Sequence, residues 1–122
     1  TRRLCVCEKV VEIFSGFPSI KSHVSIFMHF KEWGRASNTG KVLLVGNRSH
    51  SSLYIYGRKD DERELISRMC STPSLIVYPK KGVSRPIHEY NDWFKSHNGN
   101  VMICAIDSTW SQSEAMEKVL PR

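Results

Sequence analysis

A carboxylate follows a strand-length apolar run near the end of the chain. Residues 101–106, VMICAI, are apolar without interruption, which is typical of a strand buried on both faces of a parallel sheet. Asp107 comes next, and Thr109 with Gln112 has the spacing of a capping box that starts a helix. Open α/β sheets bind ligands beyond the carboxyl ends of their strands, where a carboxylate can serve as a general base. Asp107 is therefore our first catalytic candidate, and a simple helix-capping role is the alternative.

A second polar group follows an earlier apolar run. His29, Glu32 and Arg35 lie at the end of, or just after, a predicted strand over residues 23–30, which is rich in Val, Ile and Phe. Parallel strands end at the same edge of a sheet, so we expect this group to lie at the same edge as Asp107.

The cysteines fall into two kinds. Cys5 and Cys7 form a Cys-x-Cys pair, which cannot close a sound disulfide with itself but can contribute two thiolates to a metal site such as zinc. Cys70 and Cys104 stand in apolar settings and are predicted to be buried free thiols. No secretory signal is visible, so we expect a reducing, intracellular location, either cytoplasmic or nuclear.

Strand-like and helix-like patterns alternate along the chain. Strands are expected at 23–30, 53–56, 74–78 and 101–106, and helices at 60–69, 87–97 and 110–120. Residues 41–46 fit a helix or a strand, and we favour a helix because Asn38 or Thr39 can cap it. Residues 10–17 are apolar without a clear period and remain unassigned. The alternation predicts an α/β layered domain with a largely parallel sheet flanked by helices.

The composition favours a polyanionic partner. The net charge is +6 and the pI is near 9.3, and no apolar run reaches membrane-spanning length. Basic residues concentrate in the 80–85 loop, whereas residues 60–64 are acidic. The apolar group Ile87, Tyr90, Trp93 and Phe94 is interpreted as core or helix packing rather than as a surface for stacking bases.

Four short segments together resemble one family. They are Arg3-Leu4-Cys5-Val6-Cys7, His29-x-x-Glu32 with Asn38-Thr39-Gly40, Tyr78-Pro79, and Asp107-Ser108-Thr109-Trp110. In this order they resemble the motifs of the DTW-domain family of tRNA-uridine aminocarboxypropyltransferases. The resemblance implies a SPOUT-related fold that holds S-adenosylmethionine in loops at one sheet edge. It also implies transfer of the 3-amino-3-carboxypropyl group to N3 of a tRNA uridine.

The resemblance gives each candidate residue an expected role. Asp107 would remove the N3 proton, and Trp110 would hold the sulfonium by a cation–π contact. Thr109 would begin a helix whose free N–H groups suit the cofactor carboxylate, and Glu32 would bind a ribose hydroxyl or the amino group. Tyr78 and Pro79 are expected to wall the adenosine pocket. The expected contacts to tRNA phosphates are Arg35, Lys80, Lys81 and Arg85.

The sequence also departs from the family pattern. Phe30 stands where the family usually has Pro, and only the last Cys-x-Cys of a four-cysteine motif is present, so zinc is expected only in a longer protein. We expect residues 1–122 to be a single DTW-type domain that lacks part of this motif and a C-terminal segment. The alternative functions are an rRNA aminocarboxypropyltransferase, a SPOUT-type RNA methyltransferase and a non-catalytic RNA-binding module.

Overall fold

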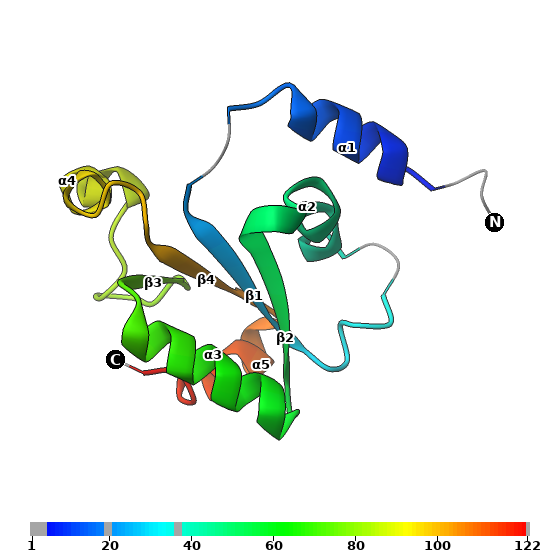
Figure 1. Ribbon diagram of the computed structural model, residues 1–122. Helices are drawn as coiled ribbons and strands as arrows, with labels where there is room; N and C mark the ends of the chain where they lie inside the picture. Colours follow the sequence, from blue (N-terminus) through cyan, green and yellow to red (C-terminus); the bar gives the residue numbers. More distant parts are fainter. Residues whose placement is uncertain (1–4, 19–20, 36–37, 122) are drawn as a thin grey trace.

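The protein forms a parallel sheet flanked by helices, as the sequence predicts (Figure 1). The computed structural model describes residues 5–18, 21–35 and 38–121. The sheet has four strands in the order β2-β1-β4-β3: β1 (His23–His29), β2 (Ser51–Tyr56), β3 (Ser74–Val77) and β4 (Met102–Asp107). The helices are α1 (Cys7–Ser15), α2 (Gly40–Gly46), α3 (Lys59–Ser71), α4 (Asn91–Ser96) and α5 (Trp110–Glu117), with 3-10 turns at Arg48–His50 and Ile87–Tyr90.

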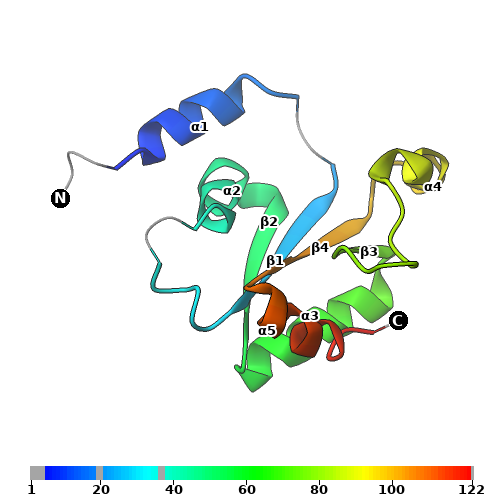
Figure 2. The same cartoon turned by 180° about the vertical axis from the view of Figure 1, so that it is seen from behind.

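Two apolar layers hold the sheet between its helices. On one face, Phe27 of β1 packs with residues of α3 and α5 such as Leu65 and Met116. On the other face, Ile26 and Met28 pack with residues of and around α2. The alternation of side chains along β1 produces both layers from consecutive residues. Figures 1 and 2 show α2 on one side of the sheet, with α1 outside it, and α3 and α5 on the other.

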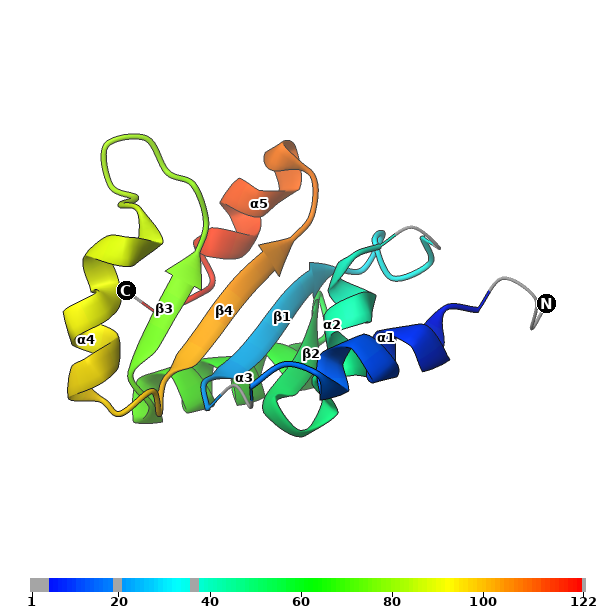
Figure 3. The same ribbon diagram turned by 90° about the horizontal axis from the view of Figure 1, so that it is seen from above.

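The strand order creates a topological switch point between the two central strands, β1 and β4. All strand pairs are parallel, so the segments that follow β1, β3 and β4 emerge at the same edge (Figure 3). The segment after β1 leads to α2 on one face, and the segment after β4 leads to α5 on the opposite face. Neighbouring strands whose connections diverge in this way define the position where open α/β sheets bind ligands.

Several predicted elements are confirmed and others need correction. Residues 41–46 lie in α2, so the preference for helix there is confirmed, and Cys104 is buried as predicted. The prediction that Cys70 is buried is wrong. Cys70 is exposed because Met69, the residue before it, occupies the buried side of α3. Most of the unassigned segment 10–17 belongs to α1, and the predicted helix 87–97 is a 3-10 turn followed by α4.

No helix in the described part of the chain is long and apolar enough to cross a membrane.

The aromatic group near α4 is only partly buried. Trp93 and Phe94 are half-buried, contact each other edge to face at 5.3 Å and belong to neither apolar cluster of the sheet, and Ile87 is exposed. The interpretation of this group as core is therefore not confirmed.

Candidate active site

Asp107 ends β4 at the switch point between the central strands. Its register partner on β1 is Met28. The neighbouring residue Ile106 packs toward the α3 and α5 side of the sheet, and Asp107 faces the opposite side, where its carboxylate meets the start of α2. Asn38 Nδ2 donates a hydrogen bond to Asp107 Oδ2 at 2.8 Å. Among the described residues, no hydrogen bond uses the second oxygen, Oδ1.

Asp107 is not the cap of the helix that follows it. Thr109 is the N-cap of α5, and the capping box predicted from the sequence is present, with Gln112 Oε1 accepting a hydrogen bond from the Thr109 N–H at 3.2 Å. The N-cap position of α5 is therefore taken by Thr109 and not by Asp107. The capping interpretation does not account for this carboxylate, which contacts α2 instead.

A glycine allows this close contact between Asp107 and α2. A Cβ atom at Gly40 would lie 2.7 Å from Asp107 Oδ2 and 3.1 Å from Asn38 Oδ1. Asn38 Oδ1 in turn accepts a hydrogen bond from the Lys41 N–H at 3.2 Å. Asn38 thus connects the first turn of α2 to the carboxylate and fixes its orientation. The sequence marked Asn38 only as a possible cap, because the contact joins residues 69 positions apart.

Glu32 is a buried carboxylate in the loop between β1 and α2. It is only 6% exposed, and its Oε2 forms an ion pair with Arg35 Nη1 at 3.1 Å. Its other oxygen, Oε1, is buried and has no hydrogen-bond partner among the described residues. A buried carboxylate oxygen without a donor is costly, which makes Glu32 a candidate for a contact with a polar ligand group.

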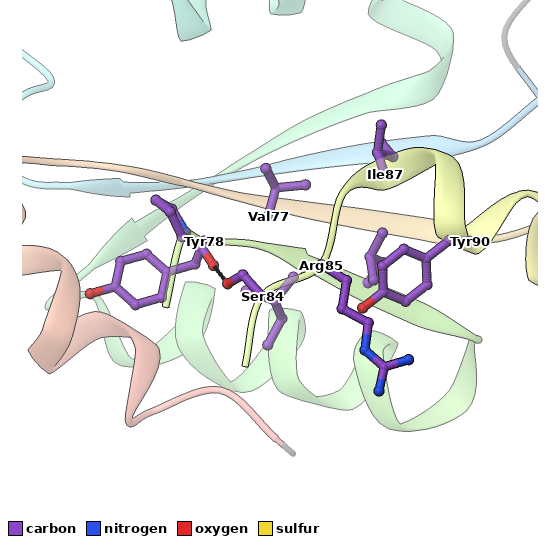
Figure 4. A pocket seen from close by; sticks show the side chains of 9 residues that line it. Val77, Tyr78, Ser84, Arg85, Ile87 and Tyr90 are labelled. Atoms are coloured by element: carbon purple, nitrogen blue, oxygen red, sulfur yellow. Dashed lines mark hydrogen bonds between the residues drawn. The ribbon is translucent and has the colours of Figure 1, made fainter. Parts of the chain in front are cut away.

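An apolar pocket lies at the end of the edge strand β3 (Figure 4). Its volume is about 270 Å³, and Tyr78, Pro79, Arg85 and Tyr90 contribute to its wall. The loop that closes it is fixed by Ser84, whose hydroxyl donates to Tyr78 O at 2.7 Å and accepts from the Lys80 N–H at 2.6 Å. Figure 4 shows this hydrogen bond to Tyr78, with the Tyr78 and Tyr90 rings on either side of it.

A second hollow adjoins the first and includes the exposed indole of Trp110. Trp110 is 73% exposed at the start of α5. Tyr78 and Pro79 line both hollows, and Lys80 and Lys81 line the second. Lys80 Nζ forms an ion pair with Glu117 at 3.2 Å. The structure thus brings together the predicted site residues of the β3 and α5 segments.

The remaining predicted site residues lie apart from these hollows. In the described part of the chain, neither hollow is lined by Asp107, Thr109, Glu32 or Arg35. Glu32 and Arg35 belong to the loop after β1, and the Asp107 carboxylate contacts the start of α2, on the side of the sheet opposite to α5. Cys5 and Cys7 are exposed at the start of α1, with their sulfur atoms 2.9 Å apart. No group of three or more potential metal ligands occurs among the described residues.

This arrangement defines a class of protein. A parallel α/β sheet with a fixed carboxylate at its topological switch point, and with hollows at the end of β3 and the start of α5, has the layout of α/β domains that bind ligands at the carboxyl ends of their strands. The model of the DTW domain family matches the chain over residues 1–122, and the chain therefore belongs to this family. DTW domains are associated with tRNA-modifying enzymes, which implies an RNA partner. No curated protein and no solved structure matches the chain.

Proposed function

We propose that this chain transfers the 3-amino-3-carboxypropyl group of S-adenosylmethionine to N3 of a uridine in tRNA. The family supports a tRNA-modifying transferase. The observation that carries the finer proposal is the fixed carboxylate of Asp107, at the switch point between β1 and β4 and three residues before the exposed Trp110. Alkylation of a weakly acidic N–H requires a proton acceptor of this kind close to the bound electrophile.

The hollows at β3 and α5 fit parts of the cofactor. The volume of about 270 Å³ is just below the ~300–1,000 Å³ typical of pockets for whole small-molecule ligands, and the lining is largely apolar. This suits the adenosine portion, with Tyr78 and Pro79 as walls. The cofactor, when bound, supplies an electrophilic γ-carbon attached to a sulfonium. Trp110 would hold that sulfonium by a cation–π contact, and the first N–H groups of α5 after Thr109 would bind the amino-acid carboxylate.

Asp107 performs the proton transfer in this proposal. Its carboxylate accepts the N3 proton as the uridine nitrogen forms a bond to the γ-carbon, and the electron pair of the broken carbon–sulfur bond remains on sulfur in methylthioadenosine. Asn38 and Gly40 hold the carboxylate in position for this step. Glu32 would bind a ribose hydroxyl or the amino group through its unpartnered oxygen.

Basic residues at the same edge would contact the tRNA backbone. Lys81, Arg85 and Arg35 are exposed, and Lys80 becomes available to a phosphate when its pairing with Glu117 is exchanged. Contacts of this kind make binding sensitive to salt.

Product mass tests the proposal directly. The chain is incubated with S-adenosylmethionine and either transcribed tRNA or an rRNA fragment, and the nucleosides are analysed by mass spectrometry. The proposal predicts a uridine that carries one aminocarboxypropyl group, found in tRNA. A methylated nucleoside would support the methyltransferase alternative, a product only in rRNA would change the substrate, and RNA binding without any product would favour a non-catalytic module.

A further inference from the structure

The loop after β1 displays two large aromatic side chains to solvent. Phe30 is 53% exposed and Trp33 is 54% exposed, and both lie within four residues of the end of β1. Neither belongs to the two apolar clusters that hold the sheet. Two aromatic side chains this close in sequence, both exposed and on one loop, indicate an interaction surface.

Hydrogen bonds hold this loop in a defined shape. The Glu32 N–H donates to His29 O at 2.8 Å, and the Arg35 N–H donates to Glu32 O at 3.1 Å. Lys41 Nζ donates to Trp33 O and, at 3.0 Å, to Arg35 O, and it lies 5.3 Å from the centre of the Trp33 ring. The aromatic groups are therefore positioned before any partner arrives, which lowers the entropy cost of binding.

Phe30 is the exposed end of a series of stacked rings. The His29 ring stacks on Phe30 at 4.4 Å and on Tyr56 at 5.5 Å, with an interplanar angle of 29° in each case. Burial, with a smaller contribution from Lys31, lowers the pKa of His29, so the ring is neutral near pH 7. Gly57 lies behind Phe30, where a Cβ atom would be 3.6 Å from its ring. A further flat ring placed against the exposed part of Phe30 would extend this series.

Cations surround the two aromatic side chains. Lys31 Nζ lies 6.0 Å from the centre of the Phe30 ring, and Arg58 follows Gly57, with its side chain mostly exposed. Arg35 is also exposed. Three acidic groups are nearby: Glu32, which is buried against Arg35, Asp61, which is 3.9 Å from Arg58, and Glu62. Glu62 is buried, accepts a hydrogen bond from the Gly57 N–H at 2.8 Å and pairs with Lys59. The exposed charge around the aromatic rings is therefore mainly positive, which suits a polyanion.

The same loop reaches the proposed catalytic carboxylate. Asn38, which precedes α2, donates to Asp107, and Met28 beside Asp107 is two residues before Phe30. The loop that carries Phe30 and Trp33 and the carboxylate of Asp107 therefore belong to the same edge of the sheet.

We propose that Phe30 and Trp33 form a stacking platform for unpaired RNA bases that flank the target uridine, with Lys31, Arg35 and Arg58 on the adjoining phosphates. The proposal rests on the proposed function in that it assumes an RNA substrate. Proteins recognise single-stranded RNA by stacking its bases on aromatic side chains within a basic groove. Because every base has a flat face, the platform positions the strand rather than reading its sequence.

Binding of a labelled RNA octamer, measured by fluorescence anisotropy, tests the platform. Phe30→Ala and Trp33→Ala should each weaken single-stranded binding by at least about fivefold, whereas Trp33→Phe should stay close to wild type. Phe17→Ala is the matched control, because Phe17 is 65% exposed and precedes the opposite end of β1, and its affinity should be unchanged. A duplex of the same sequence should bind more weakly than the single strand.

Polyphosphate of similar charge separates stacking from charge. It has no bases, so it should bind wild type, Phe30→Ala and Trp33→Ala alike. Equal losses for RNA and polyphosphate, unchanged RNA affinity in both alanine variants, or a preference for the duplex would each overturn the platform. Failure of the wild-type chain to bind any RNA would overturn it too. The product-mass measurement tests the proposed function separately. If the chain forms the product but Phe30→Ala and Trp33→Ala bind RNA as tightly as wild type, only the platform is overturned.

Discussion

The two halves of the carboxyl edge of the sheet are built differently. Between β1 and β4, polar side chains are held by one another: Asn38 fixes Asp107, and Glu32 pairs with Arg35. At the end of β3 the edge holds a largely apolar pocket of about 270 Å³, and the exposed Trp110 lines an adjoining hollow together with charged residues such as Lys80 and Glu117. The first half suits the precise placement of a reacting group, and the second suits the reception of a large ligand. Under the proposed function, chemistry and cofactor binding are thus assigned to separate halves.

The largest expected effect is loss of transfer in Asp107→Asn. A positioned general base contributes about 10²–10⁴-fold to rate, so transfer should fall by at least about 100-fold. The replacement has nearly the same shape, and an amide oxygen can still accept the hydrogen bond from Asn38. Transfer is measured by nucleoside mass spectrometry, with thermal unfolding as the control for folding. Retained turnover in a folded variant would remove Asp107 from the proposed role.

Alanine substitutions at two glycines of α2 separate an effect on transfer from an effect on stability. In Gly40→Ala, the new Cβ would meet the carboxylate of Asp107 at 2.7 Å, and the flexible side chain can move away. We expect at least about a tenfold loss of transfer, the scale of a misplaced reacting group, with stability changed by less than about 1 kcal/mol.

Gly46→Ala is the counterpart at the other end of α2. Its Cβ would clash with the ring of Phe14 in α1, and the whole ring must shift. This should cost about 1–3 kcal/mol of stability and leave transfer by the folded protein unchanged. Chemical denaturation and transfer rates measured on both variants check the pair. The opposite pattern, with Gly40→Ala unstable and Gly46→Ala inactive, would contradict the assignment of the site.

The pH dependence of stability sharpens the contrast, because a buried histidine lies at the β1 side of the edge. Burial lowers the folded-state pKa of His29 below 6.5, so the unfolded chain binds the proton more tightly. Stability should therefore be fully present above about pH 6.5 and should fall as the pH drops toward the folded pKa. His29→Phe, which preserves a stacked ring, should make this acid decline shallower in denaturation curves. His23, whose pKa is also lowered by burial, accounts for the part that remains. An identical decline in both proteins would argue against this assignment.

The smallest expected effect concerns the ion pair at the open half. Glu117→Gln should change stability by less than about 1 kcal/mol, as surface ion pairs contribute little. It frees Lys80, so RNA affinity at low salt should rise modestly. Asp92→Asn, which removes the same charge from α4 on an exposed pair with Lys95, is the matched control. Equal gains in both variants would show an effect of net charge alone.

Local sequence patterns predicted much of the fold. The uninterrupted run before Asp107 is β4, and the spacing of Thr109 and Gln112 produced the expected capping box. α1 was not predicted, because apolar residues such as Val11 and Ile13 point to solvent while Phe14 packs against α2, which blurs the helical period. Cys70 was mispredicted because its apolar neighbour, rather than Cys70 itself, faces the core.

The sequence alone predicted only part of the candidate site. Asp107 and Trp110 stand out within one short segment, but the partner of Asp107 depends on which strands are neighbours. That order places β4 beside β1 and so brings Asn38 to Asp107 across 69 residues. Alternation of strands and helices predicts parallel pairing without fixing the order. The relation to SPOUT folds stays a prediction.

Calorimetry of S-adenosylmethionine binding tests most directly whether the two halves of the edge have separate roles. The wild-type chain should bind the cofactor, Asp107→Asn should bind it with similar affinity, and Trp110→Ala should bind it about 3- to 30-fold more weakly, the range of a cation–π contact. The Trp110 side chain is largely exposed, so its loss should not unfold the protein. Weakened binding in Asp107→Asn together with unchanged binding in Trp110→Ala would contradict the account and place the cofactor at the half between β1 and β4.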